Sequence, residues 1–256
     1  MVCAVILAGG AVKPELQARF SIPSKGMIPL LGRTAVDFVV DAARSCPRIG
    51  KVALAGPEAY RTQPVMQRVD AFVPDAGHIP RNLLNAMAAL GEEQGTGLMV
   101  AGDSPLLTGE ALREFLSQVP EDADLCYPAV TKAAVLQAFP SRAWTFLRLR
   151  DSEIVCTNVL FFRASLLKSF EALADRIEVG RRKPWKLAGL FGPWFLTKYL
   201  FGQLSLASAE RRLSKLLGAK CCGVLSNNAL LAMDLDDPAD LPSVEEFLAQ
   251  SGTDGP

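Results

Sequence analysis

The feature that most constrains this chain is an apolar run near its first residue that ends in two adjacent glycines. Residues Val2–Leu7 are all apolar, and Ala8, Gly9 and Gly10 follow directly. Such a run is typical of a central parallel strand, which helices cover on both faces. Glycines at the carboxyl end of the strand let backbone N–H groups approach a ligand with no Cβ in the way. The pattern predicts a ligand-binding loop at one edge of an α/β sheet.

The remaining chain alternates apolar runs with helical patterns, which marks an open parallel sheet with helices on both faces. We predict strands at 2–7, 51–55, 70–73, 98–101, 124–129, 155–162 and 220–225. We predict helices at 34–45, 80–92, 109–118, 163–174 and 238–249. The expected fold class is α/β, a three-layer, doubly wound and mostly parallel sheet with a helical insertion before the last strand. Ligands of such sheets bind outside the carboxyl ends of the strands.

Length and composition predict a single domain over residues 1–256, because half of the residues are apolar and 21% are charged. The 27 Lys and Arg residues balance 27 Asp and Glu residues, which argues against nucleic acid as a partner. Six cysteines without a C-x-x-C pair, and a single histidine, argue against structural zinc and disulfides. Reduced thiols fit a cytoplasmic protein. The run 2–7 is too short for a signal peptide or a membrane span.

A lysine follows the glycine loop at a distance of fifteen residues, in the stretch from Lys25 to Arg33. Two glycines and a lysine alone fit an ordinary turn about as well as a phosphate site. The loop is neither a Walker loop nor a G-x-G-x-x-G fingerprint. However, Leu-Ala-Gly-Gly followed by Lys-x-x-x-Pro-Leu-x-Gly-Arg resembles the opening signature of the Rossmann-like nucleotidyltransferases. This family has the nucleotide-diphospho-sugar transferase fold and includes molybdenum-cofactor nucleotidyltransferases, methylerythritol-phosphate cytidylyltransferase and sugar-phosphate nucleotidylyltransferases.

The resemblance implies that the opening loop binds a nucleotide. The residues expected to bind it are Leu7, Ala8, Gly9, Gly10 and Lys25. Lys25 is also expected to be catalytic, because it would stabilise the charge that builds on the α- and β-phosphates. The family loop often carries an arginine shortly after the glycines, whereas this chain has Ala11-Val12-Lys13-Pro14-Glu15. Lys13 and Arg19 are both candidates to replace that arginine, and the sequence leaves the choice open.

A second junction joins an apolar strand to an acidic residue. The strand expected at 98–101 runs into Gly102-Asp103-Ser104-Pro105. Asp103 lies too early to cap the helix at 109–118, for which Thr108 is the better cap. A carboxylate at a strand end is well placed for Mg²⁺, which prefers one or two carboxylates with phosphate oxygens and water. The stretch resembles the Gly-Asp-x-Pro of the family, in which the aspartate binds the metal, so Asp103 is an expected metal ligand and catalytic residue.

A third junction holds four aspartates between 234 and 240. Strand alternation would place Asp234 and Asp236 on one face. Asp237, followed by Pro238 and by Asp240 in the first turn, has the form of a helix cap, which explains those two acids. The segment also resembles the Asp-x-Asp-x-Pro-x-Asp-Leu close of the family, in which the second acid completes the metal site. Asp236 is therefore the second expected metal ligand, and Asp234 is the weaker candidate.

Two asparagines complete the expected site. Asn158 enters an apolar strand, where an amide needs a hydrogen-bond partner from the backbone or from a ligand. The family places an asparagine at the head of such a strand beside the acceptor, which favours acceptor binding by Asn158. Asn82 and His78 lie in the loop that opens the helix at 80–92 and fit plain loop residues. The family uses the corresponding loop near the base, so Asn82 is expected to bind the nucleotide.

The expected function is a metal-dependent nucleotidyltransferase. It would move NMP from an NTP to a small phosphorylated acceptor, release pyrophosphate and use Mg²⁺ held by Asp103 and Asp236. Two other classes compete: a nucleotide-binding regulatory module without turnover, suggested by the altered loop at 11–22, and a nucleotide-sugar-dependent glycosyltransferase. A glycosyltransferase usually holds its metal on a single Asp-x-Asp, whereas Asp103 and Asp236 are far apart in this sequence.

Residues 176–218 form an insertion that the core fold does not explain. A basic cluster at 181–186 precedes a stretch rich in aromatic residues and leucine, which is too short and too interrupted to span a bilayer. We predict two helices, near 184–201 and 206–217, that bury most of Trp185, Trp194 and Phe195. The preferred use is packing against the parent domain or against a second subunit in a homodimer. A wall for the acceptor ranks second, and interfacial membrane contact ranks last.

Overall fold

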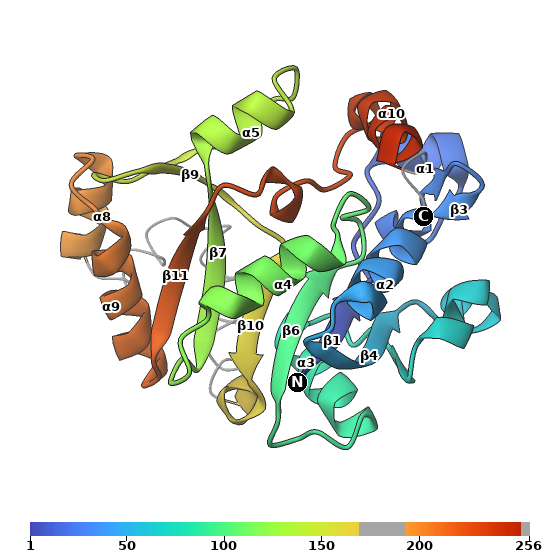
Figure 1. Cartoon of the computed structure of the whole chain (residues 1–256), viewed down its shortest axis with the longest axis horizontal. Helices are drawn as coiled ribbons and strands as arrows, with labels where there is room; N and C mark the ends of the chain where they lie inside the picture. Colours follow the sequence, from blue (N-terminus) through green and yellow to red (C-terminus); the bar gives the residue numbers. More distant parts are fainter. Residues whose placement is uncertain (169–192, 252–256) are drawn as a thin grey trace.

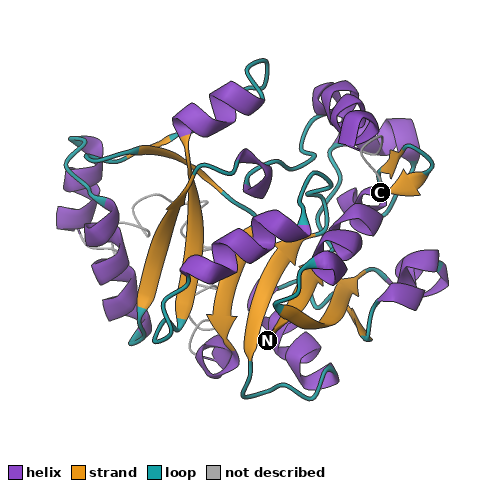
Figure 2. Ribbon diagram, in the orientation of Figure 1, coloured by secondary structure: helices purple, strands orange, loops and turns teal. Residues whose placement is uncertain are grey.

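The structure is a computed structural model that describes residues 1–168 and 193–251. Its centre is a nine-stranded mixed sheet (Figures 1 and 2). One half is parallel, in the order β5 (Ala71–Pro74), β4 (Ile49–Gly56), β1 (Val2–Leu7) and β6 (Thr96–Ala101). In the other half, β10 (Val159–Arg163) runs antiparallel between β6 and β7 (Leu125–Thr131), and β11 (Cys221–Ser226) is parallel to β7. The predicted α/β class and mostly parallel sheet are confirmed.

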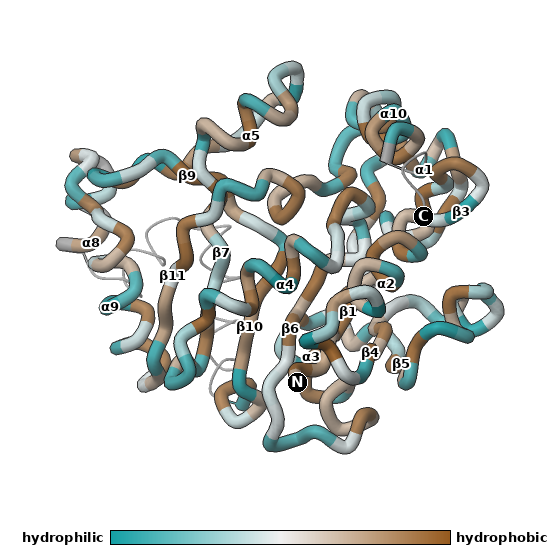
Figure 3. Tube along the Cα trace, in the orientation of Figure 1, coloured by the Kyte–Doolittle hydropathy of each residue, from teal (hydrophilic) through white to brown (hydrophobic). Residues whose placement is uncertain are grey.

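Helices cover both faces of the sheet, as a three-layer fold requires. On one face, α2 (Ala35–Ser45) and α4 (Gly109–Gln118) pack over β1, β4 and β6. On the other face, α3 (Ile79–Ala89) packs on the residues of β1, β4 and β5 whose side chains point the opposite way. Apolar side chains on both faces explain why these strands read as continuous apolar runs. Figure 3 shows hydrophobic colouring on the central strands.

Each expected helix cap is present. Thr108 accepts a hydrogen bond from the N–H of Ala111 and begins α4. Asp237 and Asp240 form a capping box around a short 3-10 turn, Pro238–Asp240, which leads into α10 (Leu241–Ser251). The structure also contains elements that the sequence pattern did not predict, among them α1 (Pro14–Phe20), α5 (Lys132–Ala138) and the short hairpin of β2 (Pro29–Leu30) and β3 (Arg33–Thr34).

The predicted single strand at 155–162 is wrong. The segment contains two strands, β9 (Glu153–Cys156) and β10, which pair antiparallel with the later and the earlier part of β7. The break falls at Thr157 and Asn158 because the side chain of Tyr127 takes the place of a backbone partner. The Tyr127 hydroxyl accepts from the Thr157 N–H and donates to the Thr157 carbonyl at 3.1 Å. β9 continues the sheet to β8 (Leu147–Arg148).

The insertion is helical where the structure describes it. The predicted helix at 206–217 is confirmed as α9 (Leu206–Leu217), which packs beside β11. The first predicted helix is present over its later part as α8 (Pro193–Leu200), whereas 184–192, with Trp185, lies outside the described residues. Phe195 is half-buried against a cluster that includes Leu149 and Leu204. Of the helix predicted at 163–174, the structure describes residues to 168, which include a 3-10 turn, Ala164–Leu166.

No helix in the two described ranges has the length and apolar character that a bilayer crossing requires.

We predict that Gly97→Ala destabilises the protein, because Gly97 faces Phe162 across the β6–β10 pair and an added Cβ would overlap its ring. Phe162 is fully buried, so the ring has little room to move. The free energy of unfolding, measured by urea denaturation, should fall by about 1–3 kcal/mol.

Gly50→Ala is the matched control. It lies in β4, and a Cβ there would have ordinary contacts with Met1, the nearest at 3.6 Å. Its effect should stay within about 0.5 kcal/mol. Equal losses in the two variants would contradict the packing argument.

Candidate active site

The candidate site lies at the carboxyl ends of β1 and β6, where the sequence placed it. Gly9 and Gly10 follow β1, and Asp103 follows β6. The Gly102 N–H donates to the Leu7 carbonyl at 2.8 Å, which holds the two strand ends together. The Leu235 N–H donates to the Asp103 carbonyl at 2.8 Å and brings the distant aspartate-rich segment to the same place.

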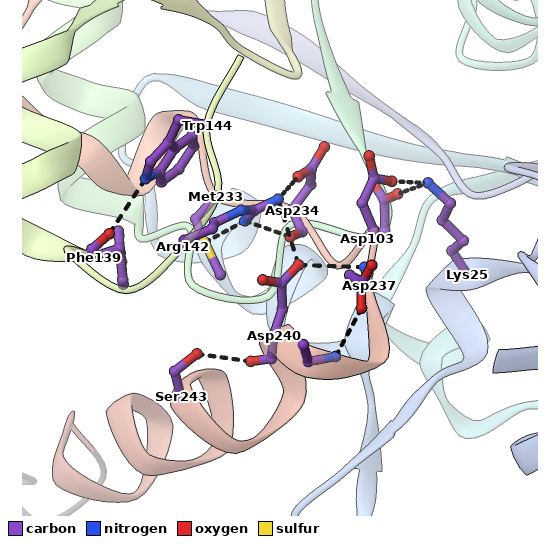
Figure 4. A network of polar contacts seen from close by, with 12 residues as sticks. Lys25, Asp103, Phe139, Arg142, Trp144, Met233, Asp234, Asp237, Asp240 and Ser243 are labelled. Atoms are coloured by element: carbon purple, nitrogen blue, oxygen red, sulfur yellow. Dashed lines mark hydrogen bonds and ion pairs between the residues drawn. The ribbon is translucent and has the colours of Figure 1, made fainter. Parts of the chain in front are cut away.

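Lys25 lies between the two acids expected to bind metal. Its Nζ is 3.3 Å from Oδ2 of Asp103, and it donates a hydrogen bond to Oδ1 of Asp236. Figure 4 shows the ion pair of Lys25 with Asp103 beside the network formed by the other aspartates. The structure therefore brings together three of the predicted residues from segments up to 211 positions apart.

The turn that carries Lys25 is held in two ways. Its N–H donates to the Gly10 carbonyl at 3.2 Å, so the lysine turn lies directly on the glycine loop. Beside it, the buried Ser24 hydroxyl lies 3.0 Å from the hydroxyl of fully buried Tyr60. Gly26 leaves room for that tyrosine, because a Cβ at Gly26 would meet the Tyr60 hydroxyl at 2.5 Å. These contacts aim a flexible side chain at one point of the sheet edge.

Burial and charge oppose each other in this cluster. Burial raises the pKa of Asp103 above its ordinary value, although the nearby Lys25 ammonium lowers it. For Asp236, burial would raise the pKa, but the hydrogen bond and charge of Lys25 outweigh it, and the pKa is lowered. Burial lowers the pKa of Lys25, but the two carboxylates outweigh this effect and raise it. Lys25 thus stays charged and contacts two carboxylates, of which that of Asp103 is largely buried and that of Asp236 is about half exposed.

On the other side of the glycine loop lies a network that the sequence analysis missed in part. Asp75 follows β5 and accepts hydrogen bonds from Asn82 Nδ2 at 2.7 Å and from the Gly77 N–H at 2.9 Å. Asn82 also accepts from the Ala76 N–H at 2.7 Å. A Cβ at Gly9 would overlap the Asp75 carboxylate, which shows how closely the two loops approach. Asp75 could have been found by the same strand-end rule that identified Asp103.

Asn158 has a side-chain partner. It lies at the break before β10, and its Nδ2 donates to Oδ2 of Asp234 at 2.7 Å. Arg142, which the sequence analysis missed, donates to the other carboxylate oxygen of Asp234 at 2.6 Å and to its carbonyl at 2.8 Å. Asp234 and Asp236 therefore have different partners. The expectation that they share one face of a strand is wrong, because 232–237 is not a strand.

A cleft of about 1100 Å³ opens beside Asp236. Its walls come from 138–147, after α5, and from 232–250, which includes α10 (Figure 1), and Tyr199 of α8 also lines it. Lys13 lines this cleft and forms an ion pair with Asp237 at 3.9 Å, whereas Arg19 stacks on the ring of Phe20. Of the two basic residues that the sequence left open, Lys13 is the one that faces the cleft.

Several solved structures have a similar fold. A hypothetical transferase from Thermus thermophilus is 32% identical, with a TM-score of 0.83 over 94% of this chain and 100% of that one. CMP:2-keto-3-deoxy-manno-octonic acid synthetase, solved with CTP, is 14% identical, with a TM-score of 0.63 over 98% and 99%. The 4-diphosphocytidyl-2C-methyl-D-erythritol synthase from Anaerococcus prevotii is 14% identical, with a TM-score of 0.56 over 97% and 96%. The last two similarities show the fold alone.

Among curated proteins, a sequence comparison found no significant match. Residues 4–187 match the family model described as the MobA-like NTP transferase domain, which is more than half of the chain. This match covers the glycine loop, Lys25, Asp103 and Asn158. The chain belongs to the MobA-like NTP transferase family.

Proposed function

We propose that the protein is a metal-dependent nucleotidyltransferase that moves NMP from an NTP to a small phosphorylated acceptor and releases pyrophosphate. The observation that carries this proposal is the placement of Lys25 between Asp103 and Asp236, directly beside the glycine loop. A positive charge and two carboxylates beside the carboxyl edge of a parallel sheet are the groups that the binding of a triphosphate needs.

The residues present fit Mg²⁺. Two carboxylates converge on one point, which in this structure the Lys25 ammonium occupies. Over residues 1–168 and 193–251, no group of three or more His, Cys, Asp or Glu side chains forms an all-protein metal cage. This donor set suits Mg²⁺, which takes its remaining ligands from phosphate oxygens and water. Asp103 and Asp236 would hold the ion, which when bound supplies charge to stabilise the triphosphate.

The side chains of this chain would then divide the remaining work. Lys25 would move from the carboxylates to the α- and β-phosphates, and the N–H groups of Gly9 and Gly10 would bind the same phosphates. The loop of Asn82 and Asp75 lies against Gly9 and would contact the base. Asn158 and the cleft beside Asp236 would hold the acceptor. Positioning of this kind needs no nucleophilic side chain.

The reaction is an in-line displacement. An oxygen of the acceptor phosphate forms a bond to the α-phosphorus, and the bond from that phosphorus to the bridging oxygen of the β-phosphate breaks. Pyrophosphate leaves with the bonding electron pair. The charge that builds on the leaving group is adjacent to the position that Lys25 would take.

Pyrophosphate release is the direct test. Each of the four NTPs is combined with phosphorylated sugars, alditols and cofactors, with Mg²⁺ and with EDTA. We expect Mg²⁺-dependent release that requires one NTP and one acceptor. Nucleotide binding without release would instead support a regulatory module, and release of a nucleoside diphosphate from a nucleotide sugar would support a glycosyltransferase.

Loss of either carboxylate should abolish turnover. Asp103→Asn and Asp236→Asn each remove a proposed metal ligand while keeping the shape of the side chain. Each variant should lose on the order of a thousandfold or more in rate, because a metal ligand contributes several kcal/mol to transition-state stabilisation. Steady-state pyrophosphate assays measure this loss. Activity within a factor of about three of wild type in either variant would refute the metal assignment.

The stability of Asp103→Asn relative to wild type should depend on pH. Since burial raises the pKa of Asp103 above 3.8, the folded protein binds this proton more tightly than the unfolded chain. The stability from this group is present below the unfolded pKa and is lost as pH rises through the raised folded pKa. Asparagine does not titrate. The melting temperature of the variant, minus that of wild type, should therefore rise as the pH is increased above about 4, and a constant difference would contradict the pKa assignment.

Lys25→Ala should lower kcat by roughly 10²-fold or more, with a smaller effect on NTP affinity. The reason is that the ammonium matters most where negative charge develops. Lys220→Ala is the control, because Lys220 is exposed and pairs with Asp122 away from the site. A variant that only raised KM would make Lys25 a binding residue, and unchanged kinetics would remove it from the mechanism.

A further inference from the structure

Arg142 is a largely buried cation that no sequence motif identifies. Its side chain is 12% exposed and its guanidinium stacks on the ring of Trp144 at 4.7 Å. Nη1 donates to the carbonyl of Asp234 at 2.8 Å, and Nη2 donates to a carboxylate oxygen of the same residue at 2.6 Å. A carboxylate oxygen of Asp240 lies 3.6 Å from Nη2 of Arg142. Figure 4 shows Arg142 in the middle of this network.

These contacts join three separate segments of the chain. Arg142 belongs to the cleft wall at 138–147, and Asp234 belongs to the segment that carries Asp236. The second carboxylate oxygen of Asp234 accepts from Asn158, at the head of β10. The guanidinium thus lies where the cleft wall, the proposed metal ligand and the proposed acceptor ligand meet.

The two hydrogen bonds from Arg142 to Asp234 show which part of the chain Arg142 holds in place. A planar guanidinium that binds the side chain and the backbone carbonyl of one residue holds that residue's backbone as well as its carboxylate. Asp236 is only two residues further along, and its own side chain is 47% exposed with Lys25 as its hydrogen-bond partner. Once Lys25 turns to a nucleotide, the backbone contacts of Asp234 and Leu235 remain to hold Asp236 in place.

We propose that Arg142 is a positioning residue for the metal carboxylate Asp236 and that it acts through Asp234. The inference rests on the proposed nucleotidyl transfer. Arg142 donates its hydrogen bonds to Asp234 and not to Asp236 itself. Its buried charge is tolerated because Asp234 and Asp240 surround it, and removing one partner of such a group leaves the others uncompensated.

The first experiment measures kinetics. Arg142→Ala should lower kcat by about 10- to 100-fold with little change in KM for the NTP, because a misplacement of about 1 Å is enough for such a loss. Arg142→Lys should recover part of kcat, since it keeps the charge but not the two-nitrogen contact. Arg148→Ala is the matched control, because Arg148 lies in the same part of the chain with its side chain 81% exposed.

The second experiment measures metal binding apart from turnover. Mn²⁺ is titrated into the protein with an equimolar mixture of the α,β-methylene analogues of ATP, GTP, CTP and UTP. The enhancement of water proton relaxation then reports the protein-bound ion. Arg142→Ala should weaken Mn²⁺ binding by about 10-fold or more, and Asp234→Asn should do the same. Their double variant should lose no more than either one, because both changes break one connection.

Each result decides a separate question. Unchanged Mn²⁺ affinity in Arg142→Ala, with only a raised KM for the acceptor, would reduce Arg142 to a part of the cleft wall and overturn the inference alone. Additive losses in the double variant would also overturn it. If wild type bound no Mn²⁺ with nucleotide, the proposed metal site would fall, and this inference with it. If circular dichroism showed that Arg142→Ala does not fold, Asp234→Asn and Arg142→Lys would carry the same comparison.

Discussion

The structure of the site depends on one electrostatic arrangement, the Lys25 ammonium between the carboxylates of Asp103 and Asp236. Two acids close to each other at the end of a buried sheet would repel, and Asp103 is already costly to ionise because it is buried. The single positive charge of Lys25 contacts both carboxylates and offsets part of their repulsion. The same arrangement makes the site sensitive to ligand binding. A ligand that draws Lys25 away leaves the two carboxylates in need of another cation.

Strand direction explains why these residues meet. β1 and β6 are parallel, so their carboxyl ends lie at one edge and present Gly9 and Asp103 together. β10 runs the opposite way between β6 and β7, so its first residues reach that edge, and Asn158 lies there. The aspartate-rich segment then crosses the edge and is held by the Asp103 carbonyl and by Arg142. The fold gathers one residue from each segment at one place.

The sequence predicted the residues that lie in recognisable motifs and missed Arg142, which lies in none, and Asp75, although Asp75 directly follows β5. Lys25, Asp103 and Asp236 were identified from strand ends and motifs, and the structure brings them together. Arg142 lies in an irregular stretch, and its partner is 92 residues away, so neither periodicity nor spacing points to it. The break at Thr157 and Asn158 depends on the hydroxyl of Tyr127 in the neighbouring strand β7. Such a tertiary contact cannot be read from the apolar pattern of residues 155–162.

The antiparallel course of β10 also decides where the chain can vary. β10 ends, and β11 begins, at the edge of the sheet opposite the glycine loop. The segment between them includes α9, which precedes β11, and α8, whose Tyr199 lines the cleft. Both ends of the segment between β10 and β11 therefore lie at the edge of the sheet that does not carry the candidate active site. A change in the length of that segment would leave the register between β6 and β10 the same, and it would alter the lining of the cleft at Tyr199.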